Sequence, residues 1–179
     1  MDQALVDFWF SAEVSKLWFN STPAFDRLLR ERYLDLWQQA SQGELEHWGE
    51  TAPGSLALVI LLDQIPLNMF RGSARSYSSE TRSREVAQAA IDRGFDRELP
   101  VAQRAFLYMP FMHSEDIEDQ QVAIELFSRS GMESNLRDAR HHHGIVEKFG
   151  RFPHRNAALG RADTDAEIEY LNSKQAFKG

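Results

Sequence analysis

The chain contains no cysteine, and this absence excludes several chemistries at once. Without thiols the chain can form neither a disulfide framework, nor a thiolate nucleophile, nor a sulfur-ligated zinc site. Long apolar runs are also lacking, because the longest, Leu56 to Leu62, is too short to cross a bilayer. The N-terminal residues lack the basic start and apolar core of a signal peptide. We therefore expect a cytoplasmic protein without membrane contact.

An excess of positive charge is lacking as well. The chain has 27 acidic and 20 basic residues and a net charge of -7, which opposes contact with phosphate backbones. Nucleic acid is therefore not an expected partner. Apolar residues are abundant, at 42% with 12 Phe, and the 179 residues are enough for one core. We predict a single domain over residues 1–179, with a loose tail over 173–179.

The alternating pattern of β-strands is absent, and Pro and Gly divide the chain into segments of helical length. One amphipathic helix should follow a cap at Ser21 or Thr22. Pro66 should kink or break the next, mostly apolar helix, which we expect to be the most buried. The remaining helices are expected over 79–93, 99–112, 115–129 and 133–149, with a last short one through Leu171 after a Thr164–Glu167 capping box.

Two pairs of these helices are spaced like a repeat. Val86-Ala87 and Val122-Ala123 recur at nearly the period of two-helix tetratricopeptide repeats, although the sequence pattern of that repeat is poor here. The prediction is an all-α fold, a tetratricopeptide-like helical repeat or bundle of roughly eight helices.

Polar side chains lie on the apolar faces of three consecutive helices. His113, Gln120 and His142 each share a stripe with large apolar residues, so each should point inward. A buried polar group without a partner costs about 1–3 kcal/mol, so these groups need partners. Either they form an interhelical hydrogen-bond network, or they line a pocket.

A second polar concentration follows the helix of His142. Residues 149–156 contain two Arg, a His and an Asn between apolar rings. Guanidinium forks suit carboxylates and phosphates, so this segment could clamp an anion. Alternatively, it is a structural loop whose arginines pair with acids such as Asp63 or Asp116.

A third polar set interrupts an apolar run. Asp63, Gln64, Asn68 and Arg71 lie on either side of Pro66, where they either contact a ligand or satisfy backbone groups at the helix break. No complete metal-binding motif, nucleophile elbow or glycine-rich phosphate loop is present. We therefore predict no metal and no cofactor.

Several motifs stand out together: Phe8-Trp9-Phe10, Trp18-Phe19, Leu61-Leu62-Asp63-Gln64, Asn68-x-Phe70-Arg71-Gly72, His113-Ser114-Glu115-Asp116 and Phe149-Gly150-Arg151-Phe152-Pro153-His154-Arg155-Asn156. They resemble the bacterial family catalogued as domain of unknown function 924, and the resemblance runs from about residue 5 to residue 172. It implies a tetratricopeptide-like all-helical fold and no established activity.

The resemblance also implies a set of motif residues. In this chain they are Asp63, Gln64, Asn68, Arg71, His113, Glu115, Asp116, Gln120, His142, Arg151, His154, Arg155 and Asn156. The chain departs from the family pattern at Met112, where Glu is frequent, and at His143-Gly144, where Arg-Asp is usual. The missing carboxylates weaken the case for a metal site.

Together these observations predict a polar site that binds a small anionic molecule. Its residues would be His113, Gln120, His142, Arg151, His154 and Arg155. His113 or His142 is the candidate for acid–base catalysis, because an imidazole titrates near neutrality, although the sequence does not show that a reaction occurs. The alternative is a protein-interaction scaffold whose polar cluster is only a structural network. A homo-oligomer without a ligand is a third hypothesis, and the sequence fixes no oligomeric state.

Overall fold

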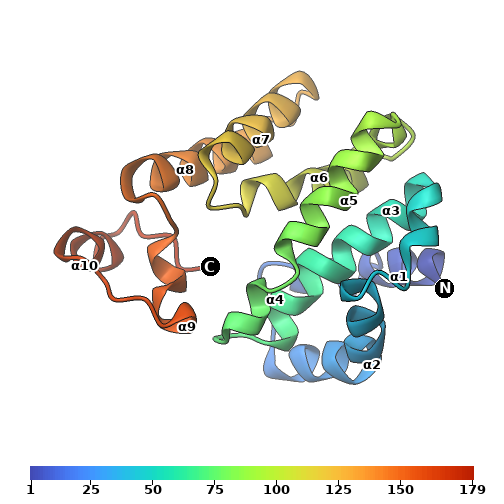
Figure 1. Cartoon of the computed structure of the whole chain (residues 1–179), viewed down its shortest axis with the longest axis horizontal. Coiled ribbons are helices and arrows are strands. Elements are labelled where there is room, and N and C mark those ends of the chain that lie inside the picture. Colours follow the sequence, from blue (N-terminus) through green and yellow to red (C-terminus); the bar gives the residue numbers. More distant parts are fainter. The chain divides into compact units, whose positions relative to one another are not determined.

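A computed structural model describes residues 1–179. The chain forms helices and no strand, which confirms the all-α prediction (Figure 1). The α-helices are α1 (Asp2–Trp9), α2 (Pro23–Ser41), α3 (Ala52–Val59), α4 (Ile65–Met69), α5 (Glu80–Asp92), α6 (Val101–Met112), α7 (Ile117–Arg129), α8 (Glu133–Phe149), α9 (Asn156–Leu159) and α10 (Asp165–Leu171). The shorter 3-10 and π segments are η1 (Ser15–Leu17), η2 (Glu46–Glu50), η3 (Ile60–Gln64), η4 (Ala74–Tyr77), η5 (Phe95–Arg97) and η6 (Pro153–Arg155).

The four helices predicted between residues 79 and 149 correspond to α5, α6, α7 and α8. The caps of two other helices, α2 and α10, follow the sequence signals. Thr22 caps α2 by accepting a hydrogen bond from the backbone N–H of Phe25 at 3.2 Å. The predicted capping box is present at α10, where Thr164 and Glu167 each accept the other's backbone N–H.

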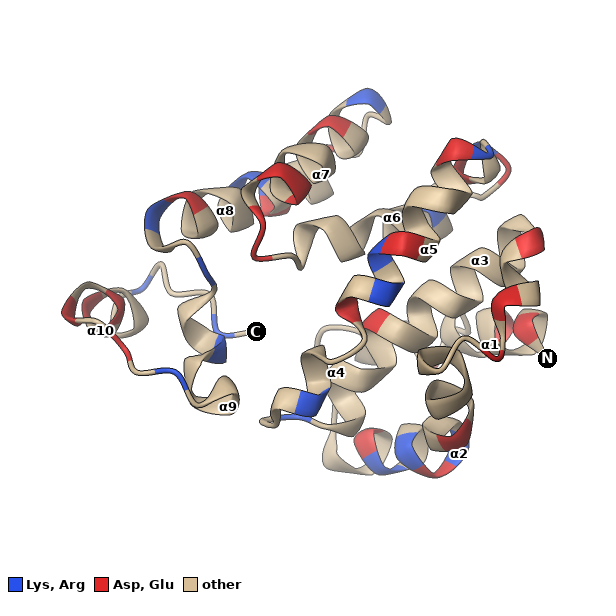
Figure 2. Ribbon diagram, viewed as in Figure 1, with Lys and Arg blue, Asp and Glu red and all other residues tan.

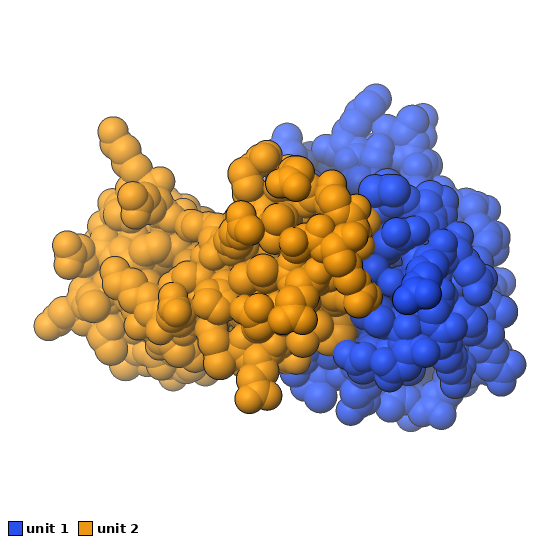
Figure 3. All heavy atoms as spheres, turned by 90° about the horizontal axis from the view of Figure 1, so that it is seen from above, with its two compact units in different colours: residues 1–71, 75–110 blue, residues 72–74, 111–179 orange.

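The chain divides into two compact units (Figure 3). Unit 1 consists of residues 1–71 and 75–110, and unit 2 of residues 72–74 and 111–179. The expectation of a single domain over 1–179 stays a prediction.

The centre of unit 1 is α3, as the apolar composition predicted. Helices α1 and α5 and segment η2 all pack against it. It is drawn without charged residues in Figure 2, and Asp63 is the one charged residue between Ala52 and Met69. That stretch is long and apolar enough to span a membrane by length and composition, yet 89% of it is buried inside the protein. Such burial is what a core helix shows.

The sequence predicted a kink or a break at Pro66, and the structure shows no break. The chain instead widens into the π-helical segment η3 and continues directly into α4. The backbone N–H of Ile65 bonds to the carbonyl of Ile60, five residues back. A wider turn makes room for a proline ring and tolerates its missing N–H, which explains why helical geometry survives. Asp63 and Gln64 lie in this wide turn, and both are buried.

In unit 2, α7 and α8 pack side by side as a helical hairpin (Figure 1). Gly131 in the connecting turn has a φ of 67°, a left-handed conformation that glycine adopts without strain. A small core lies at the C-terminal end of α8, where Ile145, Val146 and Phe152 are buried. Partly buried rings, including that of Phe177, pack against this core.

Candidate functional site

The predicted site residues fall into two groups, one in each unit. Asp63, Gln64, Asn68 and Arg71 belong to unit 1. The members in unit 2 are His113, Glu115, Asp116, Gln120, His142, Arg151, His154, Arg155 and Asn156.

The group in unit 1 forms a chain of hydrogen bonds. Gln64 Nε2 donates to Asp63 Oδ2 at 2.6 Å, and Asn68 Nδ2 donates to the backbone carbonyl of Gln64 at 3.2 Å. The Arg71 guanidinium donates to Asn68 Oδ1 at 2.8 Å and to the carboxylate of Asp26 at 2.9 Å. These bonds match the alternative that polar side chains satisfy one another and the backbone around the wide turn.

In unit 2, two donors hold the turn that carries His113. Gln120 Nε2 donates to the carbonyls of Met112 and Ser114, at 2.6 and 2.7 Å. Arg155 Nη2 donates to the carbonyl of His113 at 2.8 Å. The carbonyls of Met112, His113 and Ser114, at the C-terminal end of α6, thereby each accept a hydrogen bond from a side chain. Gln120 is fully buried, as its apolar stripe predicted.

The acidic motif residues accept hydrogen bonds from backbone N–H groups and from one arginine. Asp116 caps α7 by accepting the N–H of Glu118 at 2.8 Å. Glu115 accepts the N–H of Phe152 at 2.7 Å and both ends of the Arg161 guanidinium, at 2.7 and 2.8 Å. Burial works to raise the pKa of Glu115, but the hydrogen bonds from Arg161 and Phe152 outweigh it and lower that pKa.

Arg151 forms an ion pair with a carboxylate of the same unit. Its Nε and Nη2 donate to the two carboxylate oxygens of Glu167, at 2.7 and 2.8 Å, and Nη2 also donates to the Ala162 carbonyl. The hydrogen bond from Arg151 is the largest cause that lowers the pKa of Glu167 to about 2. Because its guanidinium already binds a carboxylate in a bidentate way, Arg151 fits the alternative of a structural loop better than that of an anion clamp.

Asn156 is also part of the framework. Its Nδ2 donates to Asp163 Oδ1 at 2.7 Å, and its Oδ1 accepts from Arg161 Nε at 2.9 Å. The side chain is almost completely buried. Asn156 therefore links the loop after α9 to the Arg161–Glu115 ion pair.

The imidazoles gather around aromatic rings, in what we call the histidine cluster: His113, His142 and His154 with Phe152 and Phe177. The ring centroids of His113 and His142 lie 6.5 Å apart. Phe152 lies 5.6 Å from His142 and 5.6 Å from His154. Phe177 lies 4.5 Å from His142 and 5.0 Å from His154. The structure thus brings three of the predicted residues together in unit 2.

Two imidazoles of this cluster are held neutral. Burial is the main cause that lowers the pKa of His142 to about 3. Burial, reinforced by the positive charge of Arg155, lowers the pKa of His154 to about 4. The Nδ1 atom of His142 lies 2.8 Å from the Asp138 carbonyl, which can only accept, so Nδ1 carries the proton. A group with this pKa is a weak proton carrier at neutral pH, so the geometry does not favour acid–base catalysis by His142.

Sequence reasoning missed three residues of this region. Glu167 could have been found, because the capping box predicted from the sequence fixes its position. Arg161 gave no signal, since it lies outside the polar segment 149–156. Phe177 lies in the segment expected to be loose. The chain contains no group of three or more His, Asp or Glu side chains placed to hold a metal ion.

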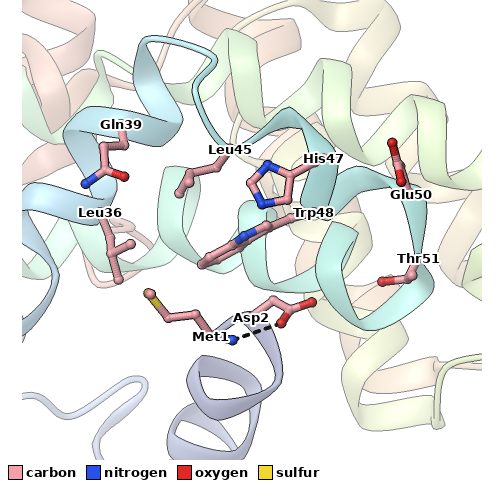
Figure 4. A pocket seen from close by; sticks show the side chains of 9 residues that line it. All are labelled: Met1, Asp2, Leu36, Gln39, Leu45, His47, Trp48, Glu50 and Thr51. Atoms are coloured by element: carbon pink, nitrogen blue, oxygen red, sulfur yellow. Dashed lines mark hydrogen bonds and ion pairs between the residues drawn. The ribbon is translucent and has the colours of Figure 1, made fainter.

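A surface hollow lies elsewhere, in unit 1 (Figure 4). It has a volume of about 680 Å³ and contains none of the predicted site residues. The rings of His47 and Trp48 line one side, and the amine of Met1 bonds to Asp2 at 3.3 Å. Its lining residues are Met1, Asp2, Leu36, Gln39, Leu45, His47, Trp48, Glu50 and Thr51.

A smaller hollow of about 420 Å³ also lies in unit 1 and includes Arg82 and Arg93. Both arginines have partners there. Arg82 pairs with Glu46, and Arg93 donates to the Gly49 carbonyl at 2.8 Å. Neither hollow is lined by any of the predicted site residues.

The fold and the polar groups define an all-α protein with a buried hydrogen-bond framework and a histidine cluster. The chain belongs to the family described as bacterial protein of unknown function (DUF924), whose model matches residues 5–175. It is similar to the solved structure of a protein of unknown function, ATU0120 from Agrobacterium tumefaciens, at 44% sequence identity and a TM-score of 0.90. That likeness covers 96% of each chain. No curated protein matches the sequence.

Proposed function

We propose that the histidine cluster of unit 2 binds a small anionic molecule. The observation that carries the proposal is the clustering of His113 and His154 with the Arg155 guanidinium, whose charge lies 4.8 Å from the centre of the Phe152 ring. The carboxylate of Glu115 in the same unit is already neutralised by Arg161. A guanidinium and imidazole N–H groups gathered in one place are the donors that suit an anion.

The charges that act on His154 are mainly positive, although the whole chain carries a net charge of -7. Besides burial, positive charges on Arg155, His113 and Arg161 lower the pKa of His154, and Glu115 works in the opposite direction. An anion placed among these groups would relieve that repulsion and raise the imidazole pKa. Binding would then take up a proton, so affinity should increase as the pH falls.

The proposal assigns different roles to the residues predicted from the sequence. His113, His154 and Arg155 would face the ligand, whereas Gln120 would position the His113 turn. Arg151 would be structural, because its fork is bound to Glu167. No reaction is assigned to the site, and a cytoplasmic location is part of the same proposal.

The second candidate is a protein-interaction scaffold of tetratricopeptide-like helix pairs. The α7–α8 hairpin favours it, and so do the ion pairs that already occupy Arg151 and Glu115. Phe19, which is 79% exposed, offers an aromatic anchor of the kind found in protein interfaces. The anion proposal differs from this one because it requires a response of the histidine cluster to small ions.

A thermal-shift titration with sulfate tests the proposal. Sulfate suits the test because, unlike histidine, it does not titrate between about pH 5 and pH 8. We expect sulfate, compared with chloride at equal ionic strength, to raise the melting temperature of the wild type more at low pH than at high pH. His154→Gln should abolish this difference, whereas His47→Gln, at an exposed site in unit 1, should retain it. An equal sulfate response in all three proteins would overturn the proposal, because sulfate also stabilises proteins non-specifically.

A further inference from the structure

The ring of Phe177 occupies the histidine cluster although it comes from the last residues of the chain. It meets His142 at an interplanar angle of 61° and His154 at 83°, both edge-to-face arrangements that aromatic rings favour. It also packs against the core formed by Ile145, Val146 and Phe152. The cluster therefore contains a place shaped for an aromatic ring.

The segment that delivers this ring forms its hydrogen bonds locally. Helix α10 ends at Leu171, and residues 172–175 are exposed to solvent. The backbone N–H groups of Ser173 and Phe177 donate to the carbonyl and the hydroxyl of Tyr170, and that of Ala176 donates to the carbonyl of Ser173. Exposed segments whose hydrogen bonds are local open at low free-energy cost. The Phe177 ring can therefore leave its place while the rest of unit 2 stays folded.

Two neighbouring rings connect the position of Phe177 with the Arg155 guanidinium. Phe177 contacts His154, and the ring of His154 lies beside that of Phe152, over which the Arg155 guanidinium stacks. A ligand with an aromatic ring in the place of Phe177 could thus direct an attached anionic group toward Arg155. Phe177 itself supplies the ring and no anionic side-chain group.

We propose that the natural ligand of the histidine cluster is an aryl anion, an aromatic ring bearing a carboxylate or phosphate, and that Phe177 holds the ring position until such a ligand displaces it. This inference rests on the proposed anion site. It specifies the class of ligand and the side chain that the ligand must displace. When a site is mostly occupied by its own chain, the apparent affinity falls by the fraction of molecules in which it is open. Removing the ring of Phe177 should remove that competition.

The test compares phenyl phosphate with inorganic phosphate by calorimetric titration of the full-length protein. In Phe177→Ala we expect the affinity for phenyl phosphate to rise about tenfold over wild type, and that for inorganic phosphate to change less than about twofold. Phe177→Leu, which keeps an apolar side chain, should give a smaller gain. Phe19→Ala, which removes an exposed ring in unit 1, should leave both affinities unchanged.

The outcomes separate this inference from the proposal on which it rests. If inorganic phosphate binds every protein but phenyl phosphate gains nothing in Phe177→Ala, the aryl-anion inference fails and the anion site stands. An equal gain in affinity for both ligands would also overturn the aryl-anion inference, because Phe177 would then block the site for any anion and not specifically for an aromatic ring. If neither ligand binds any of the proteins, both proposals fail.

Discussion

At the scale of single residues, the amide of Gln120 has the clearest structural role. Its two N–H bonds satisfy carbonyls on both sides of His113. Replacing it by leucine would leave both carbonyls without these donors inside the protein. Unsatisfied buried groups of this kind cost about 1–3 kcal/mol.

We therefore predict that Gln120→Leu lowers the free energy of unfolding by about 1–3 kcal/mol in urea denaturation. The matched control is Gln121→Leu, one residue further on, where the side chain is exposed and bonds to Glu125 at 3.1 Å. The control should change stability by less than about 0.5 kcal/mol. Equal effects of the two substitutions would contradict the role assigned to Gln120.

Single residues also show what the sequence could and could not reveal. Helical periodicity predicted that Gln120 and His142 point inward, and both are buried. Periodicity assigns a residue to a face of its own helix and carries no information on distant partners. Glu115 and Arg161 pair across 46 residues, and no local pattern predicted that contact.

At the scale of helices, two glycines of similar helical setting should respond in opposite ways to alanine. A Cβ at Gly54, in the first turns of α3, would collide with the backbone carbonyl oxygen of Trp48. A Cβ at Gly144, in α8, would meet nothing within 4 Å. Alanine also loses less conformational freedom in a helix than glycine does.

We predict that Gly54→Ala destabilises the protein by about 2 kcal/mol or more, because α3 must move away from η2. Gly144→Ala should stabilise it by about 0.5–1 kcal/mol. Thermal and urea unfolding of the two variants measure both effects. A stable Gly54→Ala protein would show that α3 and η2 do not pack as closely as described.

The last helix depends on its capping box. Thr164→Ala removes the hydroxyl that accepts the N–H of Glu167 and should cost about 1 kcal/mol. Thr164→Ser keeps the hydroxyl and should lose much less. Circular dichroism during denaturation measures the difference, and equal losses in the two variants would contradict the capping role.

Helices were predicted well because caps, glycines and periodicity are local signals. The signal of Pro66 is also local, but the way in which the helix accommodates this proline depends on packing against distant residues. A proline in a helix can be accommodated by a break, a kink or a wider turn, and the packing of Leu61 and Leu62 in the core keeps this segment helical.

At the scale of the whole molecule, acid should destabilise the protein through its buried histidines. The pKa of His142 is about 3 in the folded protein, against an ordinary value of 6.5. Between these two pKa values the unfolded chain therefore binds a proton at His142 that the folded chain does not bind. The resulting stability is fully present above about pH 6.5 and is lost as the pH falls below it.

We predict that His142→Gln flattens the fall in unfolding free energy between about pH 7 and pH 5 by about 1–2 kcal/mol. His47→Gln, at an exposed position, should leave the fall unchanged. Urea denaturation at several pH values measures both slopes. The paired carboxylate Glu167, whose pKa is about 2, should add a further loss only below about pH 4.

The organisation of the whole molecule was less accessible from the sequence than its elements. Length and composition predicted a single domain, and they gave no indication of the two compact units that divide near Pro110. No linker rich in glycine or proline marks that division, because it falls within the continuous helix α6. The histidine cluster likewise depends on Phe177, whose segment has no helical pattern.

The central claim is that the histidine cluster binds an anion, and NMR of the imidazole nitrogens tests it most directly. Sulfate would be titrated into the protein at constant ionic strength and constant pH. The account predicts that the signals of His113 and His154 shift saturably and move toward the protonated form, while that of His47 stays in place. Unchanged signals of His113 and His154 at saturating sulfate would contradict the claim and leave the cluster as part of the structural framework.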